Sequence, residues 1–188
     1  MNYNMENDIG TILLGADEIR EISKRIGGQI SEDFKDSEKL VLLCILKGST
    51  PFFADLMREV TIPCEIEFMR VSSYAGTEST GKLNVRLDMH RDDIGECDII
   101  IVEDIIDSGN TLYMLKSYLE EKGARSVSIC TLLDKPDRRA EHIKGHLTTD
   151  YTGAVIPDEF VVGYGLDYDE KYRNLPYIGI LKREVYEK

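Results

Sequence analysis

Cys97-Asp-Ile-Ile-Ile-Val-Glu-Asp-Ile-Ile-Asp-Ser-Gly-Asn-Thr-Leu112 is the stretch that decides the fold. Its residues 98–102 form a nearly unbroken run of branched apolar side chains, which predicts a short strand buried on both faces. A turn of small residues, 107–111, leads into a helical stretch over residues 112–122. After the strand come three acids: Glu103, Asp104 and Asp107. This order of elements predicts an anion site, because backbone N–H groups and the helix dipole face the turn.

The acids next to this anion site indicate what kind of ligand it binds. Carboxylates beside a phosphate site are useful if the ligand also carries a divalent cation or sugar hydroxyls. A sugar phosphate with Mg²⁺ meets both conditions. The alternative is that the acids only cap the following helix, although one cap does not need three carboxylates.

Composition and charge exclude several classes of protein. The 188 residues suit one domain, and 42% hydrophobic residues are enough for a core. The net charge of −12 argues against nucleic acid or an anionic membrane as the main partner. The first residues do not resemble a signal peptide, and no apolar run approaches the ~20 residues of a membrane span. The four cysteines lie in or beside apolar runs without a Cys-x-x-Cys pair, which predicts reduced thiols in a cytoplasmic protein.

The rest of the chain alternates between expected strands and helices. Residues 1–14 are expected to form a loose lead-in, and residues 72–84 a polar arm too long for a tight turn. Apolar periodicity predicts a helix over residues 16–34, with Gly27-Gly28 as its weak point, and Pro51 opens another helix. Further strands are expected over residues 40–46, 64–71, 83–87, 126–133, 154–157, 160–163 and 177–181.

This alternation predicts a mostly parallel twisted sheet with helices on both faces. Ligands of such sheets bind beyond the carboxyl ends of the strands. Lys47, the 103–111 segment and Lys135 each follow an expected core strand, so we expect them to converge at one edge of the sheet although they are far apart in sequence.

The segment Val102–Thr111 resembles the phosphoribosyl-pyrophosphate (PRPP) signature of the type I phosphoribosyltransferases, and its Glu-Asp-Ile-Ile-Asp form is most similar to the hypoxanthine-guanine enzymes. The resemblance extends from about residue 41 to 177. It implies a single phosphoribosyltransferase domain over residues 1–188, with a core of about 36–150 and a flexible loop of about 72–84. A small hood would be built from two terminal segments: residues 1–35 and 151–188.

The resemblance also implies a pyrophosphate site. Lys47 and Gly48 match the family's pyrophosphate loop, in which the peptide before the lysine is often cis, and Arg173 matches an arginine that contacts pyrophosphate. Taken alone, Lys47 could be a solvated lysine and Arg173 a surface ion-pair partner. Ser73 and Tyr74 match the flexible loop that closes over the site, although Tyr74 could simply pack on the surface. The family often has a lysine where this chain has Ser72, so any contact of that lysine is in doubt.

The signature itself would bind the sugar and its phosphate. Glu103 and Asp104 match acids that hold the ribose hydroxyls and Mg²⁺, and Asp107 matches the general base beside N7 of the purine. Asn110 stands where many relatives have lysine, which leaves the amides in place but puts one positive charge in doubt. The expected 5′-phosphate loop comprises Asp107, Ser108, Gly109, Asn110 and Thr111.

The base pocket would come from the second half of the chain. Lys135 matches a lysine that donates to the purine O6, which favours a 6-oxo over a 6-amino base because lysine can only donate. Phe160 matches the ring that stacks on the purine, and the Val161 backbone would lie at the base edge. Asp167 matches an acid that binds a second Mg²⁺ and lies near the purine 2-position. Taken alone, Lys135 could be an exposed turn residue, and Phe160 and Val161 could be core residues.

The resemblance therefore implies transfer of phosphoribose from PRPP to hypoxanthine or guanine, with Mg²⁺, giving IMP or GMP and pyrophosphate. It also implies a homodimer or homotetramer. Xanthine remains an alternative base, because it differs from guanine only at the 2-position. A second alternative is a nucleotide-binding regulator with the same fold, although the acidic charge lacks the basic face that a nucleic-acid binder needs. A phospho-acceptor domain is a third, but it would not explain residues 160–167.

Overall fold

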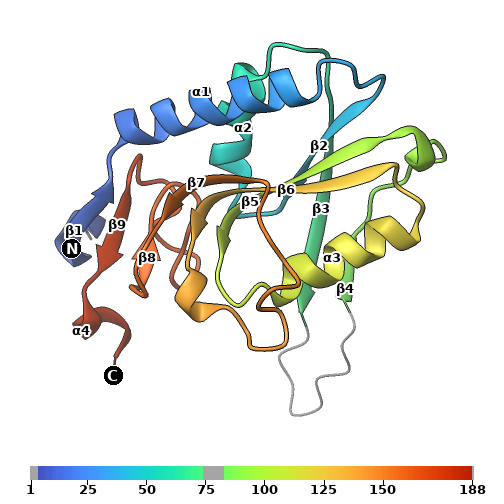
Figure 1. Cartoon of the computed structure of the whole chain (residues 1–188). Helices are drawn as coiled ribbons and strands as arrows, with labels where there is room; N and C mark the ends of the chain where they lie inside the picture. Colours follow the sequence, from blue (N-terminus) through green and yellow to red (C-terminus); the bar gives the residue numbers. More distant parts are fainter. Residues whose placement is uncertain (1–3, 74–82, 188) are drawn as a thin grey trace.

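The protein, described by a computed structural model over residues 4–73 and 83–187, is built around a six-stranded sheet in the order β4-β3-β2-β5-β6-β7. All neighbouring strands are parallel except β3 and β4, so the predicted mostly parallel sheet is confirmed (Figure 1). The strands are β2 (Leu40–Ile45), β3 (Glu65–Ser73), β4 (Leu83–Leu87), β5 (Asp98–Ile106), β6 (Ser126–Asp134) and β7 (Tyr151–Val155).

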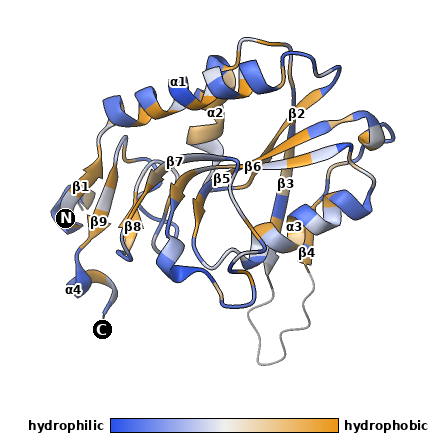
Figure 2. Ribbon diagram, viewed as in Figure 1, coloured by the Kyte–Doolittle hydropathy of each residue, from blue (hydrophilic) through white to orange (hydrophobic). Residues whose placement is uncertain are grey.

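Helices cover both faces of this sheet. In Figure 1, α1 (Ala16–Asp33) and α2 (Thr50–Glu59) lie above it, and α3 (Asn110–Glu121) lies below. The central strand β2 is buried along its whole length, and its residues alternate between two cores. Leu42 packs with α1 and α2, whereas Leu43 packs on the side of α3. Figure 2 shows the result as apolar strands between helices with hydrophilic outer faces.

The strand that carries the acids is longer than expected. It runs from Asp98 to Ile106 rather than ending at Val102, and α3 begins at Asn110 rather than Leu112. Glu103 is still paired with Thr131 of β6. The ladder continues because it is made by backbone groups, which pair in the same way under polar side chains.

A second sheet joins the two ends of the chain in the order β1-β9-β8. The expectation of a loose lead-in over residues 1–14 is wrong, because β1 pairs antiparallel with β9. β1 is short and mostly exposed, so its own residues carry little strand signal. Its partner lies more than 160 residues away, where local reasoning does not reach. The elements are η1 (Met5–Asp8), β1 (Ile9–Leu14), β8 (Val161–Val162), β9 (Ile178–Leu181) and α4 (Arg183–Tyr186).

Two expected strands in the second half of the chain change their bounds most. The strand expected over residues 154–157 is β7, which begins at Tyr151 and ends before Pro157, since proline cannot donate to a ladder. The strand expected over 160–163 shortens to β8. Gly163, with φ of +97°, turns the chain away after it. Two further short 3₁₀ helices are η2 (Ile94–Glu96) and η3 (Pro136–Arg138).

Helix α1 continues without a break through Gly27-Gly28. A Cβ atom at Gly27 would lie 2.5 Å from Cβ of Glu59 and 2.7 Å from its carbonyl carbon, so glycine there lets α1 approach α2 closely. Ser31, one turn later, accepts a hydrogen bond from the Thr61 N–H at 2.9 Å. The weak point expected at these glycines is instead a helix-packing contact. No helix in the described part of the chain is long and apolar enough to cross a bilayer.

Candidate active site

The carboxyl ends of β2, β5 and β6 bring the predicted site residues together. Gly48, just after β2, lies so close to Asp104 of β5 that a Cβ atom on it would be 1.7 Å from Oδ2 of Asp104. Lys135, just after β6, donates its backbone N–H to the Ile106 carbonyl at 3.0 Å. The predicted convergence of Lys47, the 103–111 segment and Lys135 at one sheet edge is therefore confirmed.

The turn after β2 is held in a compact form. The Leu46–Lys47 peptide is cis, as the family resemblance implied. Gly48 lies against Gly165, whose φ is +101°: a Cβ atom on Gly165 would lie 1.9 Å from the Gly48 carbonyl oxygen. The two glycines thus allow the backbone after β2 and the loop after β8 to touch.

Glu103 and Asp104 are half-buried at the end of β5, where their negative charge is poorly solvated. Burial, followed by the neighbouring Asp104, raises the pKa of Glu103 well above its usual range. Burial also raises the pKa of Asp104 to about 6, although the Ile105 N–H and the charge of Arg173 act in the opposite direction. This N–H donates to Oδ1 of Asp104 at 2.7 Å and orients the carboxylate. Such a pair is stabilised by any cation that approaches it.

The acids fit a hydrated divalent cation better than a metal bound by protein alone. Within residues 4–73 and 83–187, no group of three or more His, Cys, Asp or Glu side chains is arranged to hold a metal ion. Mg²⁺ does not require one, because it keeps several waters and uses one or two carboxylates plus substrate oxygens. Glu103 and Asp104 supply such hard oxygen donors. Asp167 is near enough for its charge to raise the pKa of Asp104, and it forms an ion pair with Arg173 at 2.8 Å.

The turn between β5 and α3 is built for close approach to an anion. Gly109, with φ of +81°, caps α3 at its N-terminus, where the first N–H groups have no partner within the helix. Asn110 donates its side-chain amide to Oγ of Ser108 at 3.2 Å, and Thr111 lies in the first helical turn. The Ala140 N–H donates to the Ser108 carbonyl at 3.0 Å and fixes the turn from outside.

Two arginines that sequence reasoning missed hold Asp107. Arg139 donates to the backbone carbonyl of Asp107 at 2.6 Å rather than to its carboxylate. Arg138 reaches that carboxylate, with Nε 3.2 Å from Oδ1, and also lies 3.6 Å from Asp158. Both arginines follow β6 in η3 and the next residue, where nothing in their spacing indicates a partner on β5.

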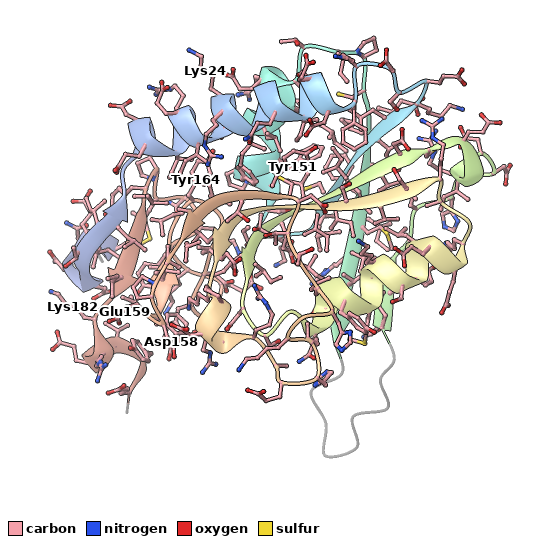
Figure 3. The ribbon with its side chains drawn as sticks, viewed as in Figure 1. Lys24, Tyr151, Asp158, Glu159, Tyr164 and Lys182 are labelled. Carbon is pink, nitrogen blue, oxygen red and sulfur yellow. The ribbon has the colours of Figure 1, made fainter. Side chains whose placement is uncertain are left out.

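The Asp107 side chain lines a cavity of about 560 Å³ together with three of the predicted base-binding residues, Lys135, Phe160 and Val161; Asp167 does not line it. Nζ of Lys135 donates to the Glu159 carbonyl at 2.7 Å, and the side chain is buried rather than an exposed turn residue. Phe160 lines the cavity and is 37% exposed, so it is not a core residue. Val161 lines the cavity from β8 and pairs with Ile180 of β9. Asp158 and Glu159 lie on the connection that enters β8 (Figure 3).

Tyr186, from the C-terminal helix α4, is a second aromatic residue at this cavity that sequence reasoning missed. Its ring stacks on Phe160 with a centroid distance of 4.9 Å and an interplanar angle of 25°. Tyr168 meets Phe160 edge-on at 5.7 Å. Two aromatic rings, Phe160 and Tyr186, therefore line the cavity, and Tyr168 contacts Phe160.

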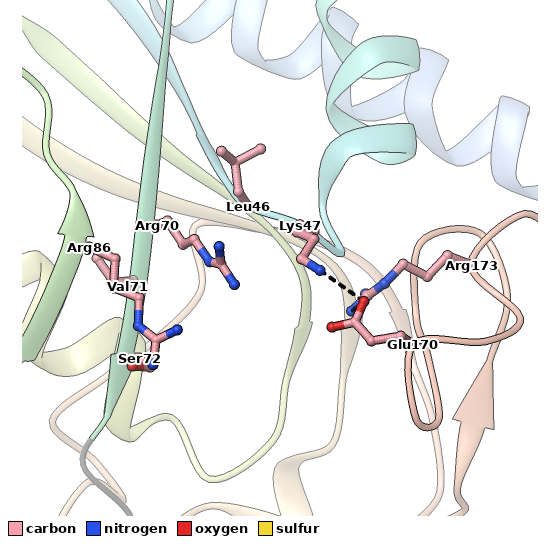
Figure 4. Close-up of a pocket in the computed structure, with 8 residues that line it drawn as sticks. All are labelled: Leu46, Lys47, Arg70, Val71, Ser72, Arg86, Glu170 and Arg173. Carbon is pink, nitrogen blue, oxygen red and sulfur yellow. Dashed lines mark hydrogen bonds and ion pairs between the residues drawn. The ribbon is translucent and has the colours of Figure 1, made fainter.

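Lys47 and Arg173 line a second cavity, of about 250 Å³ (Figure 4). The ion-pair alternative for Arg173 is seen in the structure, because Arg173 contacts Asp167 at 2.8 Å and Glu170 at 3.4 Å. Glu170 also pairs with Lys47 at 2.8 Å. Nε of Arg173 is buried and has no hydrogen-bond partner among the residues that the structure describes.

The far wall of this second cavity carries residues that no motif indicated. Arg70 and Ser72 come from β3, and Arg86 comes from β4. Ser73 ends β3 next to them, whereas Tyr74, the other residue of the expected flexible loop, lies outside the described residues. The alternation of apolar and polar residues over 69–72, Met-Arg-Val-Ser, is the signal that could have identified Arg70.

Known proteins match nearly the whole chain. The phosphoribosyl transferase domain family matches residues 10–169. The hypoxanthine-guanine phosphoribosyltransferase of Streptococcus pneumoniae is 49% identical over 183 residues, which cover 97% of this chain and 98% of that protein. The Lactococcus lactis protein of the same name is 49% identical over 189 residues, covering 100% of both chains. The crystal structure of a hypoxanthine phosphoribosyltransferase from Staphylococcus aureus aligns with a TM-score of 0.91 at 46% identity and covers 100% of both chains. The chain therefore belongs to the hypoxanthine-guanine phosphoribosyltransferase family.

Proposed function

We propose that this protein transfers the 5-phosphoribosyl group of PRPP to N9 of hypoxanthine or guanine, giving IMP or GMP and pyrophosphate in purine salvage. The observation that carries the proposal is that two cavities of different character lie at the carboxyl ends of the sheet strands, one beside β2 and β3 and the other beside β5 and β6. One is lined by cationic side chains and suits a diphosphate. The other combines aromatic rings with Lys135 and Asp107 and suits a purine.

The sugar phosphate would lie between these cavities. Its 5′-phosphate would be held by the backbone and hydroxyl groups of Ser108–Thr111 at the N-terminus of α3. The ribose hydroxyls would be held by Glu103 and Asp104. The diphosphate would bind Lys47, the amide of Gly48 and Arg173, whose buried Nε still lacks a partner in the described chain.

In this arrangement N9 of the base attacks C1′ of the sugar, and the bond from C1′ to the diphosphate oxygen breaks. Asp107 takes the proton from N7 as N9 becomes bonded. Lys135 has three N–H donors, one of which binds the Glu159 carbonyl, so the others can donate to O6 of the purine. Phe160 stacks on the base and orients it. The Val161 backbone lies at the edge of the base.

Mg²⁺ fits this site as the proposed cofactor. When bound, it would neutralise charge on the diphosphate that leaves. Glu103 and Asp104 would hold one ion, directly or through water. Asp167 would serve a second ion once the diphosphate competes with it for Arg173, its present ion-pair partner at 2.8 Å.

We also propose a cytoplasmic homodimer or homotetramer. Ile66 and Phe68 leave 46% and 37% of their surfaces exposed on β3, which supports a contact between subunits there. The four cysteines are free thiols, which supports a reducing compartment. Light scattering on the purified protein tests the assembly, and a monomer at working concentration would contradict it.

One assay tests the reaction: pyrophosphate release from PRPP and Mg²⁺ with a panel of hypoxanthine, guanine, xanthine, adenine and uracil. We expect turnover with the first two. Turnover with xanthine alone would show that xanthine, and not hypoxanthine or guanine, is the substrate. No turnover with any base would refute the proposed phosphoribosyl transfer.

Asp107→Asn tests the base role. We expect kcat to fall by about 10²-fold or more, because general acid–base catalysis contributes roughly that much, while PRPP binding changes little. Asp17→Asn is the matched control, since Asp17 is an exposed residue of α1 paired only with Arg20 in the described structure. An Asp107→Asn variant as active as the control would remove Asp107 from the mechanism.

A further inference from the structure

Arg70 and Arg86 form a cationic wall opposite the proposed pyrophosphate residues. Both line the cavity of about 250 Å³ that also contains Lys47 and Arg173. Figure 4 shows their guanidinium groups on one side of this cavity, with Lys47, Glu170 and Arg173 on the other. The two sides come from different parts of the fold, β3 and β4 on one and the segments after β2 and β8 on the other.

The strand geometry explains why both arginines face this way. Successive side chains of a strand point to opposite faces of the sheet. Met69, Val71, Leu83 and Val85 pack into the core on the side of α3. Alternate positions on the same strands, which include Arg70, therefore face the other side. There they meet the cavity instead of the core.

A shift in strand register lies at the same place. Val71 pairs with Val85 and Arg70 pairs with Leu87, so Arg86 is the extra residue of a bulge between β3 and β4. Bulges of this kind re-aim side chains and are common next to active sites. Arg86 is held on the cavity side of β4, next to Ser72 in the cavity wall.

The cations of the two cavity walls differ in whether an acidic side chain pairs with them. Lys47 and Arg173 are already paired with Glu170 and Asp167. Neither Arg70 nor Arg86 forms an ion pair or a side-chain hydrogen bond with any residue in the described ranges, 4–73 and 83–187. Among the described residues, these two guanidinium groups thus have no acidic partner, in a chain with a net charge of −12. An external anion would remove this imbalance.

We propose that Arg70 and Arg86 bind the terminal phosphate of the diphosphate, both in PRPP and in the pyrophosphate product. This inference rests on the proposed function. Ser72 lines the same cavity but carries no charge, so the positive charge of this wall comes from the two arginines. Guanidinium groups suit this ligand because their planar donors can bind two phosphate oxygens at once.

The test measures binding of inorganic pyrophosphate with Mg²⁺ by calorimetry, using the wild-type protein, Arg70→Gln, Arg86→Gln and the double variant. We expect each single variant to weaken binding at least about 10-fold and the double variant about 100-fold, as for charge-assisted hydrogen bonds. Binding of IMP, which carries no diphosphate, should stay within 2-fold. Arg20→Gln is the matched control, because Arg20 is exposed on α1, where it pairs with Asp17.

Unchanged pyrophosphate affinity in the double variant would overturn the proposal, and so would an equal loss of IMP binding, which indicates general damage to the site. If Arg70→Gln does not fold, Arg70→Lys replaces it. This variant keeps the charge without the planar fork, and we expect a smaller loss of pyrophosphate affinity.

Activity assays on the wild-type protein and the double variant distinguish failure of this inference from failure of the proposed function. A wild-type protein that converts no nucleobase refutes the reaction, whereas the pyrophosphate titration still decides the role of the arginines. In an active enzyme, loss of both arginines should raise KM for PRPP and leave KM for the base unchanged. An active double variant with wild-type KM for PRPP would exclude them while leaving the reaction intact.

Discussion

Gly48→Ala should damage the active site while leaving the fold almost intact. A Cβ atom at position 48 would lie 1.7 Å from Oδ2 and 2.9 Å from Cγ of Asp104, and 3.5 Å from the Gly165 carbonyl oxygen. Nonbonded carbon and oxygen atoms need about 3.5 Å, so the Asp104 oxygen must move by about 2 Å. Only one atom group is in the way, and it is the end of a short side chain.

The cost to folding is therefore small and the cost to catalysis large. Asp104 can rotate, which sacrifices the 2.7 Å hydrogen bond from the Ile105 N–H at a cost of about 1 kcal/mol. A displacement of about 1 Å in a positioned group can lower a rate by roughly 10²-fold. We therefore expect kcat/KM for PRPP to fall by about 10²-fold, while the free energy of unfolding falls by only about 1 kcal/mol.

The assay pairs steady-state kinetics with urea unfolding of the same preparations. Gly28→Ala is the matched control, because a Cβ atom there has no neighbour within 4 Å. A folded Gly48→Ala enzyme with wild-type kcat/KM would refute the reasoning, since Asp104 would then be free to move without consequence. A loss of several kcal/mol would refute the claim that the contact matters only at the site.

Three further predictions concern stability, acid sensitivity and the base pocket. Gly27→Ala should destabilise the fold by about 1–3 kcal/mol, because its Cβ atom would lie 2.5 Å from Cβ of Glu59. Gly28→Ala should instead stabilise the fold by up to about 1 kcal/mol. Equal urea midpoints for the two variants would contradict this opposite effect. Arg125 lowers the pKa of Asp98 to about 2, with help from Ser37 and Ser126. A carboxylate whose pKa is lower in the folded state than in the unfolded state stabilises the fold at any pH above the unfolded-state pKa. Asp98→Asn should therefore lower the free energy of unfolding by about 2 kcal/mol at pH 7. The difference in unfolding free energy between wild type and variant should shrink as the pH falls from about 4 to about 2. Tyr186→Ala should raise KM for the base roughly 2–10-fold with KM for PRPP unchanged, as expected for loss of an aromatic pair, and Tyr186→Phe should behave as wild type.

The sequence by itself predicted the elements whose signal is local. β2 and the first half of β5 are continuous apolar runs, and such runs can only be satisfied inside a sheet covered on both faces. The small-residue turn around Gly109 and the lysines after β2 and β6 lie next to those strands in the chain. Their convergence followed from the rule that parallel strands end at one edge.

Tertiary structure alone decided the features that depend on distant partners. The two-residue period of a strand predicts which face of the sheet a side chain lies on, but not what packs against that face. The proposed role of Arg70 and Arg86 therefore became visible only from the cavity that they line. The strand β1 forms because β9 lies beside it, and its own residues carry little strand signal. Tyr186 reaches Phe160 for the same reason: the chain end folds back onto a motif 26 positions earlier, and no local periodicity encodes such a return.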